Sequence, residues 1–265
     1  PWQYVFFIPA LLLRVMWLTV FRFVENSPAA AGLGEYETGD QTPEEAAAPV
    51  TLSFVLRKVF TRREPWLIAL SSMCIGMVRN SIDHFYVRYF TNVFHLSNAK
   101  LAAPYQIASV AMPLAAVLGG LAAGNASDRI FGSRRAPVIC LAFVGQALCL
   151  LLLQRVMNDA WNGAAMLVLL SFFIQSAHSL VGGAASMDFG GRKAVATAAG
   201  LFDGAQYLAG AVVAQLMGRV LNHFRVPGQE GAEFFIWPLV PLPFAVIGAV
   251  LISRLWYALP GRRGH

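Results

Sequence analysis

Seven long apolar runs divide this sequence, and each is close to the roughly 20 residues that an α-helix needs to cross the hydrocarbon core of a bilayer. Their limits are residues 2–24, 66–90, 101–123, 137–153, 164–187, 194–220 and 235–257. Backbone polar groups in lipid must bond within their own segment, so runs of this length fold as helices. Only 13% of the 265 residues are charged, against about 25% in soluble domains. We therefore predict an all-α, polytopic membrane protein.

The remaining composition excludes several classes of function. We interpret the formal net charge of +6 as a feature of membrane-protein loops, and we predict no nucleic-acid partner. Cys74, Cys140 and Cys149 all lie inside apolar runs, and their spacing fits neither a metal site nor a disulfide framework. The sequence contains no recognisable set of nucleophile, base and orienting residue. We predict no metal, no cofactor and no enzymatic activity.

Basic residues are distributed unevenly between alternate loops. One set lies in the loops after the first, third and fifth runs and in the C-terminal tail: Arg57, Lys58, Arg62, Arg63, Arg129, Arg134, Arg135, Arg192, Lys193, Arg262 and Arg263. The opposite loops hold only Lys100, Arg155 and Arg225, with Arg219 near the end of a run. Cytoplasmic loops carry an excess of Lys and Arg, so the larger set is predicted to be cytoplasmic. The N-terminus is then outside and the C-terminus inside.

The order of these segments predicts four parts. Residues 1–24 form a transmembrane helix, residues 25–64 a cytoplasmic linker, residues 65–258 a six-helix bundle and residues 259–265 a cytoplasmic tail. The short apolar stretch 52–60 in the linker is predicted to be an amphipathic helix at the membrane interface. One helix, a long linker and six more helices is the plan expected for the second half of a six-plus-six protein. We therefore expect a fragment that lacks an amino-terminal half.

The loop between the third and fourth runs carries the most specific motif, from Gly124 through Asp128 to Arg135. It resembles the cytoplasmic Gly-x-x-x-Asp-Arg/Lys loop signature of the major facilitator superfamily. Gly124 permits close approach of helices, and Asp128 is suited to neutralise a helix N-terminus or to pair with a neighbouring arginine. We predict that this loop latches the cytoplasmic ends of two helices in one state; the alternative is an ordinary basic loop. The predicted gating residues here are Asp128, Arg129, Arg134 and Arg135.

A longer stretch, residues 187–210, is similar to the hairpin between spans ten and eleven of organophosphate:phosphate antiporters. Asp188 is followed by the basic pair Arg192 and Lys193, and then by a segment of small residues. The linker sequence Asn-Ser-Pro-Ala-Ala-Ala-Gly-Leu at 26–33 is similar to the turn after span six of that family. The resemblance covers nearly the whole chain. It implies the carboxy-terminal six-helix half of a major facilitator fold, preceded by its sixth transmembrane helix, in the bacterial inner (plasma) membrane.

Arg79 lies midway along the second apolar run, where an unpaired charge costs about 2.5 to 3.5 kcal/mol on insertion scales. The resemblance implies that it is the span-seven arginine that holds substrate phosphate, and a planar guanidinium meets phosphate through two parallel hydrogen bonds. The alternatives are that Asp83, one helical turn later, neutralises Arg79, and that Asn80 simply bonds a neighbour. The predicted residues for binding a small anionic solute are Arg79, Asn80 and His84.

Other polar residues within the apolar runs are predicted to act in gating or coupling: Asp83, His178, Asp203 and Tyr207. Asp203 and Tyr207 share a helical face at i, i+4, and Asp203 is either an ion-pair partner or a proton site. An unperturbed His178 would titrate near neutral pH, but an interhelical hydrogen bond is the other interpretation. Gln206 lies in the same cluster and receives no role.

The resemblance and these residues together imply a secondary transporter that exchanges an organic phosphate for inorganic phosphate by alternating access. The site would lie at the midplane of the bilayer, shared with the missing amino-terminal half of the same fold. Two alternatives stay open. One is a membrane sensor of sugar phosphate that signals to a partner kinase, and the other is a proton-coupled major facilitator for a different solute.

Overall fold

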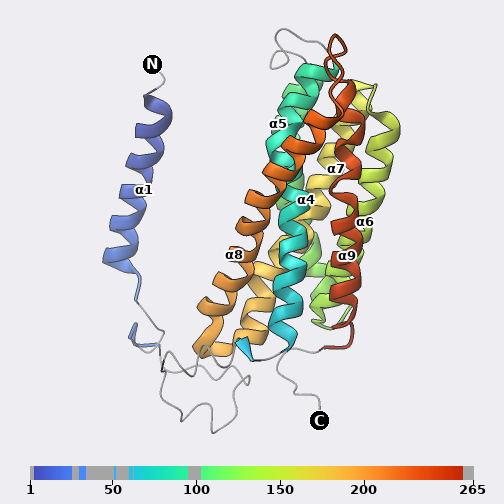
Figure 1. The fold of residues 1–265 in the computed structure, drawn as a ribbon. Helices are drawn as coiled ribbons and strands as arrows, with labels where there is room; N and C mark the ends of the chain where they lie inside the picture. Colours follow the sequence, from blue (N-terminus) through green and yellow to red (C-terminus); the bar gives the residue numbers. More distant parts are fainter. Residues whose placement is uncertain are drawn as a thin grey trace. The chain divides into compact units, whose positions relative to one another are not determined.

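The computed structural model describes residues 3–25, 30–33, 51, 60–61, 63–94 and 103–258, with the backbone alone for residues 189–193. The chain divides into two compact units, Pro1–Gly39 and Asp40–His265. The regular secondary structure of the described residues is entirely helical (Figure 1), which confirms the predicted all-α class. Most of the predicted interfacial helix at 52–60, and the predicted tail at 259–265, lie outside the described residues.

The first unit contains one helix, α1 (Tyr4–Phe23), with apolar side chains around its whole circumference. Successive residues such as Leu11, Leu12 and Leu13 point in different directions around the helix, and all three are exposed. A helix that is hydrophobic all round is expected for a membrane span rather than for the surface of a soluble domain. The first apolar run of the sequence is thus one helix.

The second unit is a helical bundle in which the chain runs up and down (Figure 1). Its elements are α4 (Arg63–Val93), α5 (Ala103–Arg129), α6 (Arg135–Val156), α7 (Ala160–Ser179), a π-helical segment η2 (Leu180–Ala185), α8 (Ser186–His223), a 3₁₀ segment η3 (Ala232–Leu239) and α9 (Leu242–Ser253). Each of the six remaining apolar runs falls on one of these helices or helix pairs. The last run is divided between η3 and α9, because Pro238 and Pro241 have no backbone N–H to donate.

Five helical stretches of the described chain are long and apolar enough to cross a membrane. They are Tyr4–Phe23, Ala103–Arg129, Arg135–Val156, Ala160–Asp188 and Ala232–Ser253. The long helices α4 and α8 do not meet the same criterion, because polar and charged residues interrupt their apolar character; α4 alone carries Arg79, Asp83 and Arg88. The two helices that fall short are therefore the ones that carry most of the predicted site.

The chain reverses direction between η2 and the middle of α8. A Cβ atom at Gly182 would lie 3.6 Å from the Asp203 carboxylate, although 21 residues separate the two positions and a straight helix of that length would span about 31 Å. The backbone is nevertheless assigned as helix from Ser186 onward. The antiparallel hairpin that the family resemblance implies is therefore present, and the backbone between the fifth and sixth apolar runs is helical.

Two close helix crossings hold the bundle together. A Cβ atom at Gly76 of α4 would collide with the backbone of Gln206 on α8, and one at Gly119 of α5 would collide with the carbonyl of Phe172 on α7. Such small residues are the usual means of helix packing in membranes, where lipid supplies no hydrophobic drive. Gly124, by contrast, has no described atom within 4 Å of its ideal Cβ position. The packing role predicted for Gly124 is therefore wrong, and Gly119 fills it one to two turns earlier.

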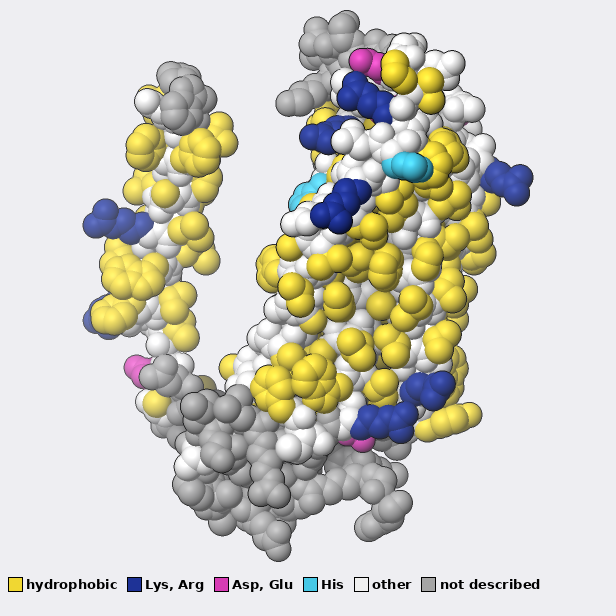
Figure 2. Space-filling view, in the orientation of Figure 1, with side chains coloured by type: hydrophobic (Ala, Val, Ile, Leu, Met, Phe, Trp, Pro, Cys, Tyr) yellow, Lys and Arg dark blue, Asp and Glu magenta, His cyan; other side chains and the backbone are white. Residues whose placement is uncertain are grey.

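A buried aromatic cluster closes one end of the bundle. Tyr89, Phe90, Phe234 and Trp237 are all almost fully buried. The Tyr89 hydroxyl donates to the Met157 carbonyl (2.8 Å) and the Trp237 Nε1 donates to the Ser81 carbonyl (3.0 Å), so α4 is tied to the end of α6 and to η3. On the face shown in Figure 2, Lys and Arg side chains gather toward the ends of the bundle, with hydrophobic side chains between them.

Candidate functional site

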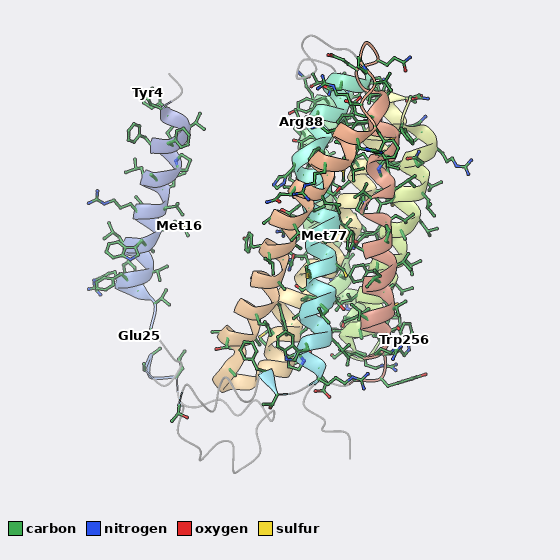
Figure 3. All side chains as sticks on the ribbon, viewed as in Figure 1. Tyr4, Met16, Glu25, Met77, Arg88 and Trp256 are labelled. Carbon is green, nitrogen blue, oxygen red and sulfur yellow. The ribbon has the colours of Figure 1, made fainter. Side chains whose placement is uncertain are left out.

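Arg79 lies near the middle of α4, within the membrane-spanning bundle. Met77, half a turn earlier, is midway along the helix, whereas Arg88 is near its end (Figure 3). Arg79 is partly buried, and among the described residues it forms no ion pair and no hydrogen bond. Asp83, one turn later, lies within electrostatic range and is itself exposed. The alternative in which Asp83 neutralises Arg79 through a direct ion pair is thus not seen in this state.

Three helices bring polar groups together beside Arg79. His178, near the end of α7, lies within electrostatic range of both Arg79 on α4 and Asp203 on α8, and close to the Gln206 side chain. Asp203 in turn lies next to Gly182 of η2, where the absence of a side chain leaves room for it. The structure therefore brings together three of the predicted residues that are far apart in sequence.

Gln206 is the residue of this cluster to which the sequence analysis gave no role. It is 1% exposed, and its side-chain amide lies beside the imidazole of His178. Nδ1 of His178 is buried as well. The signal in the sequence was an amide one turn after Asp203 within a run of small and apolar residues, which is a costly place for an unpaired polar group.

Asn80, His84 and Tyr207 take different positions. The Asn80 amide donates to the Gly76 carbonyl of its own helix (2.8 Å) and packs against Gly210, whose ideal Cβ position lies 3.0 Å from it. The structure therefore agrees with the alternative in which Asn80 simply bonds a neighbour. One N–H donor of its amide is occupied by the Gly76 carbonyl. His84 is exposed and Tyr207 is 72% exposed, so neither is part of the buried cluster.

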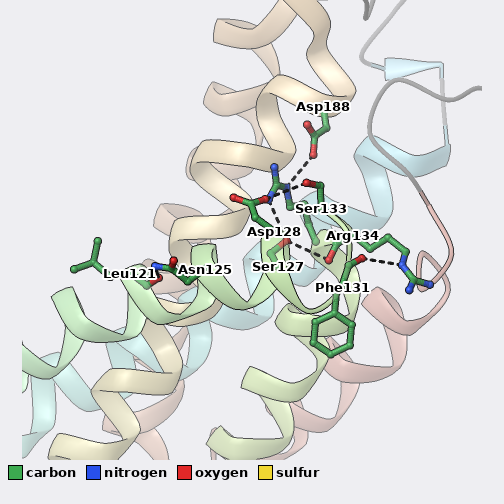
Figure 4. Close-up of polar contacts among 9 residues, drawn as sticks. Leu121, Asn125, Ser127, Asp128, Phe131, Ser133, Arg134 and Asp188 are labelled. Carbon is green, nitrogen blue, oxygen red and sulfur yellow. Dashed lines mark hydrogen bonds and ion pairs between the residues drawn. The ribbon is translucent and has the colours of Figure 1, made fainter.

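A second polar cluster lies where α5 meets α6 (Figure 4). Arg135 at the start of α6 bonds through Nη1 to the Asp128 carboxylate and to the Ser127 hydroxyl (3.0 Å), and through Nε to Asp188 of α8 (3.3 Å). Ser133 also donates to Asp128 (3.2 Å). The guanidinium is thus shared between carboxylates from two helices. Two roles were predicted for Asp128, and in the structure it pairs with an arginine, Arg135.

The guanidinium groups of the other two arginines of this loop do not join that network, although the Arg134 carbonyl accepts a hydrogen bond from the Ser127 hydroxyl (3.2 Å). Arg134 donates from Nε to the Phe131 carbonyl (3.0 Å), which stabilises the tight turn, and Arg129 is exposed. The turn itself needs left-handed backbone at Gly132 (φ 58°) and at Ser133 (φ 63°), and Ser133 is stabilised there by its bond to Asp128. The sequence analysis named Asp128 and Arg135 but missed Asp188 as the second carboxylate that Arg135 contacts.

A pocket of about 220 Å³ opens at the other end of the bundle, between α4, α8 and η3. Arg88, Arg225 and Glu233 contribute its charges. Glu233 accepts a hydrogen bond from the Gly231 N–H (2.9 Å), and Arg225 forms an ion pair with Glu230 (3.6 Å). The residues that line this pocket do not include Arg79, His178, Asp203 or Gln206, so it is separate from the cluster around Arg79. No group of three or more metal-ligating side chains occurs among the described residues.

Comparison with known proteins places these features in a family. Residues 1–214 match the model of the Major Facilitator Superfamily. The chain belongs to this superfamily. It is therefore a multi-pass membrane protein of a transporter family, which confirms the superfamily resemblance and the prediction that the chain is not an enzyme.

The relatives agree with the narrower resemblance. The chain is 27% identical over 241 residues to the glycerol-3-phosphate transporter of Bacillus subtilis (strain 168), covering 86% of this chain and 52% of the relative. It is 25% identical over 267 residues to the hexose-6-phosphate:phosphate antiporter of Salmonella typhimurium and 24% identical over 266 residues to that of Escherichia coli (strain K12). Each of these two alignments covers 97% of this chain and 55% of the relative. The facilitator chain thus spans about half the length of the relatives it matches.

Proposed function

We propose that this facilitator transports a small anionic solute, an organic phosphate that it exchanges for inorganic phosphate by alternating access. The observation that carries the proposal is Arg79. Its guanidinium is partly buried near the middle of α4 and forms no ion pair within the described structure. An arginine held at this depth is expensive, and an anionic ligand would compensate it.

The chemistry of the guanidinium suits phosphate in particular. Arginine presents five N–H donors in a rigid plane, and two of them can bond two phosphate oxygens at once. The relatives' names supply the same ligand class, since one is a glycerol-3-phosphate transporter and the others are hexose-6-phosphate:phosphate antiporters. These names favour a transporter over a sensor of sugar phosphate, and phosphate exchange over proton coupling.

We infer that the chain corresponds to the carboxy-terminal half of the fold and that Arg79 is half of a phosphate clamp. Major facilitators bind solute near the bilayer midplane between two halves that rock against each other. The second cation would come from the first span of the amino-terminal half. The lipid environment in this proposal is the plasma membrane of a bacterium.

The cluster of Asp128, Arg135 and Asp188 fits the gating part of this mechanism. Arg135 ties the α5–α6 turn to the beginning of α8 by ion pairs that a rocking motion can break and re-form. Interactions present in only one conformation shift the populations of the two states without contacting solute. In our proposal this network stabilises the state seen here.

Counterflow in proteoliposomes tests the proposed function. The full-length protein is reconstituted into vesicles loaded with inorganic phosphate, and uptake of labelled glycerol 3-phosphate or glucose 6-phosphate is followed. We expect uptake of at least one ester that depends on internal phosphate and continues after a protonophore is added. Uptake that needs a proton gradient and is indifferent to internal phosphate would support the proton-coupled alternative, and binding without any uptake would support the sensor.

A further inference from the structure

The pocket between α4, α8 and η3 contains charges of both signs that are not paired with each other. Glu233 lines it and is only 6% exposed. Its Oε2 accepts a hydrogen bond from the Gly231 N–H (2.9 Å), but neither Glu233 nor Arg88, which lines the same pocket, belongs to an ion pair of the described residues. A buried carboxylate is costly unless a cation or several hydrogen bonds compensate it. A cationic group on a ligand would compensate Glu233.

The same pocket offers donors for an anionic group. These donors are the guanidinium groups of Arg88 and Arg225 and the side-chain amides of Asn92 and Asn222. The ion pair of Arg225 with Glu230 is long (3.6 Å) and exposed, and such pairs contribute little to stability, so Arg225 is available to a ligand. Guanidinium and amide N–H groups both donate to phosphate oxygens, and a lysine in place of either arginine would keep the charge. The pocket therefore suits a ligand that carries a phosphate and a cation together.

The surroundings of the pocket are those of a bilayer interface. Arg88, which lines the pocket, is near the end of α4 (Figure 3). Phe224 and Phe235 adjoin the pocket residues Arg225 and Phe234 in the chain. Both phenylalanines are exposed, and their rings meet edge to face with centroids 5.5 Å apart. Exposed apolar side chains beside a polar pocket mark sites of membrane interaction. These rings favour a lipid, whose acyl chains would cover them, over a water-soluble ligand.

We propose that this pocket binds the headgroup of a phosphatidylethanolamine lipid, with the ammonium group at Glu233 and the phosphate at Arg88 and Arg225. The pocket has about 220 Å³ of space, whereas one water molecule needs about 10–15 Å³, so a headgroup of several atoms fits. A primary ammonium has three N–H donors for the carboxylate. Phosphatidylcholine has no N–H on its nitrogen, and phosphatidylglycerol has no cation. The site is separate from the cluster around Arg79 and does not depend on which solute is transported.

Lipid binding to the full-length protein tests this site. Native mass spectrometry in detergent gives dissociation constants for phosphatidylethanolamine, phosphatidylglycerol and phosphatidylcholine with the same acyl chains. Soluble O-phosphoethanolamine, added as a competitor, shows whether the headgroup binds without acyl chains. The variant is Glu233→Gln, which removes the charge but keeps an oxygen that can accept from the Gly231 N–H. Glu230→Gln is the control, because Glu230 lies in the same loop, is exposed and does not line the pocket.

We expect the wild-type protein and Glu230→Gln to bind phosphatidylethanolamine at least about tenfold more tightly than either other lipid, since a hydrogen bond between charged groups has about that effect. In Glu233→Gln this preference should shrink toward one, with no loss of affinity for phosphatidylglycerol. Equal affinities for the three lipids in the wild-type protein would overturn the proposal even where the variant does not fold. An unchanged preference in Glu233→Gln would also overturn it, and an altered exchange rate beside that unchanged preference would indicate instead that Arg88 and Glu233 pair in another conformation. Soluble O-phosphoethanolamine that binds as tightly as the lipid would contradict the assignment to a lipid.

Discussion

Arg135 at the start of α6 contacts Asp188 on α8 through its Nε atom at 3.3 Å, although the two residues are 53 positions apart. Both side chains are mostly buried. The contact ties the turn after α5 to the beginning of α8. Asp188 is thus a partner of Arg135 that lies outside the loop motif at residues 124–135.

Replacement of Asp128 by Asn should slow exchange far more than it weakens binding of solute. Asp128 is the second carboxylate on Arg135, and in our proposal the network stabilises one conformation without touching ligand. We expect an exchange rate about tenfold lower with equilibrium affinity within about threefold. Glu230→Gln is the matched control, because it removes an exposed ion pair with Arg225 at the other end of the bundle. A large loss of affinity with an unchanged rate per bound solute would argue against gating.

Substitution of Gly119 by Ala should destabilise the bundle, whereas the same change at Gly124 should not. A Cβ atom at Gly119 would collide with the Phe172 backbone, and one at Gly124 meets no described atom within 4 Å. Overpacking of this kind costs about 1–3 kcal/mol, while Ala in place of Gly within a helix is favourable by up to about 1 kcal/mol. Melting temperatures in detergent measure both. Equal melting temperatures for the two variants would contradict the close approach of α5 and α7.

The termini of the chain are predicted to lie on opposite sides of the membrane, with the linker inside, because Lys and Arg concentrate in alternate loops. Single cysteines at Ala47 and Asn222, in a background without the three native cysteines, report this. An impermeant maleimide added to intact cells should label position 222 and spare position 47 until the cells are opened. Stronger labelling of intact cells at position 47 would reverse the topology.

The fold was largely predictable from the sequence, because apolar runs of about 20 residues fix the helices with little help from tertiary contacts. Pairing of Asp128 with an arginine was one of the two roles that the loop motif predicted for it. The contact with Asp188 was not predictable, since nothing in local spacing shows which helix end faces Arg135. Gly124 and Gly119 show the same limit: both are small residues on α5, but only the three-dimensional packing shows that Gly119 faces Phe172. Gln206 was overlooked because its burial beside His178 depends on how α7 and α8 pack, which only the structure reveals.

Exchange by the Arg79→Lys and Asp83→Asn variants, matched for expression in proteoliposomes, tests the central role of Arg79 most directly. Lysine keeps the charge but loses the planar donors that meet phosphate bidentately, so phosphate-dependent exchange should fall by at least about tenfold, given about 1.5–3 kcal/mol for a hydrogen bond to a charged group. Arg88→Lys, near the end of the same helix, should keep wild-type exchange, and Asp83→Asn should be the milder change because no ion pair joins Asp83 to Arg79 within the described structure. Near wild-type exchange in Arg79→Lys together with severe loss in Asp83→Asn would remove Arg79 from the binding site.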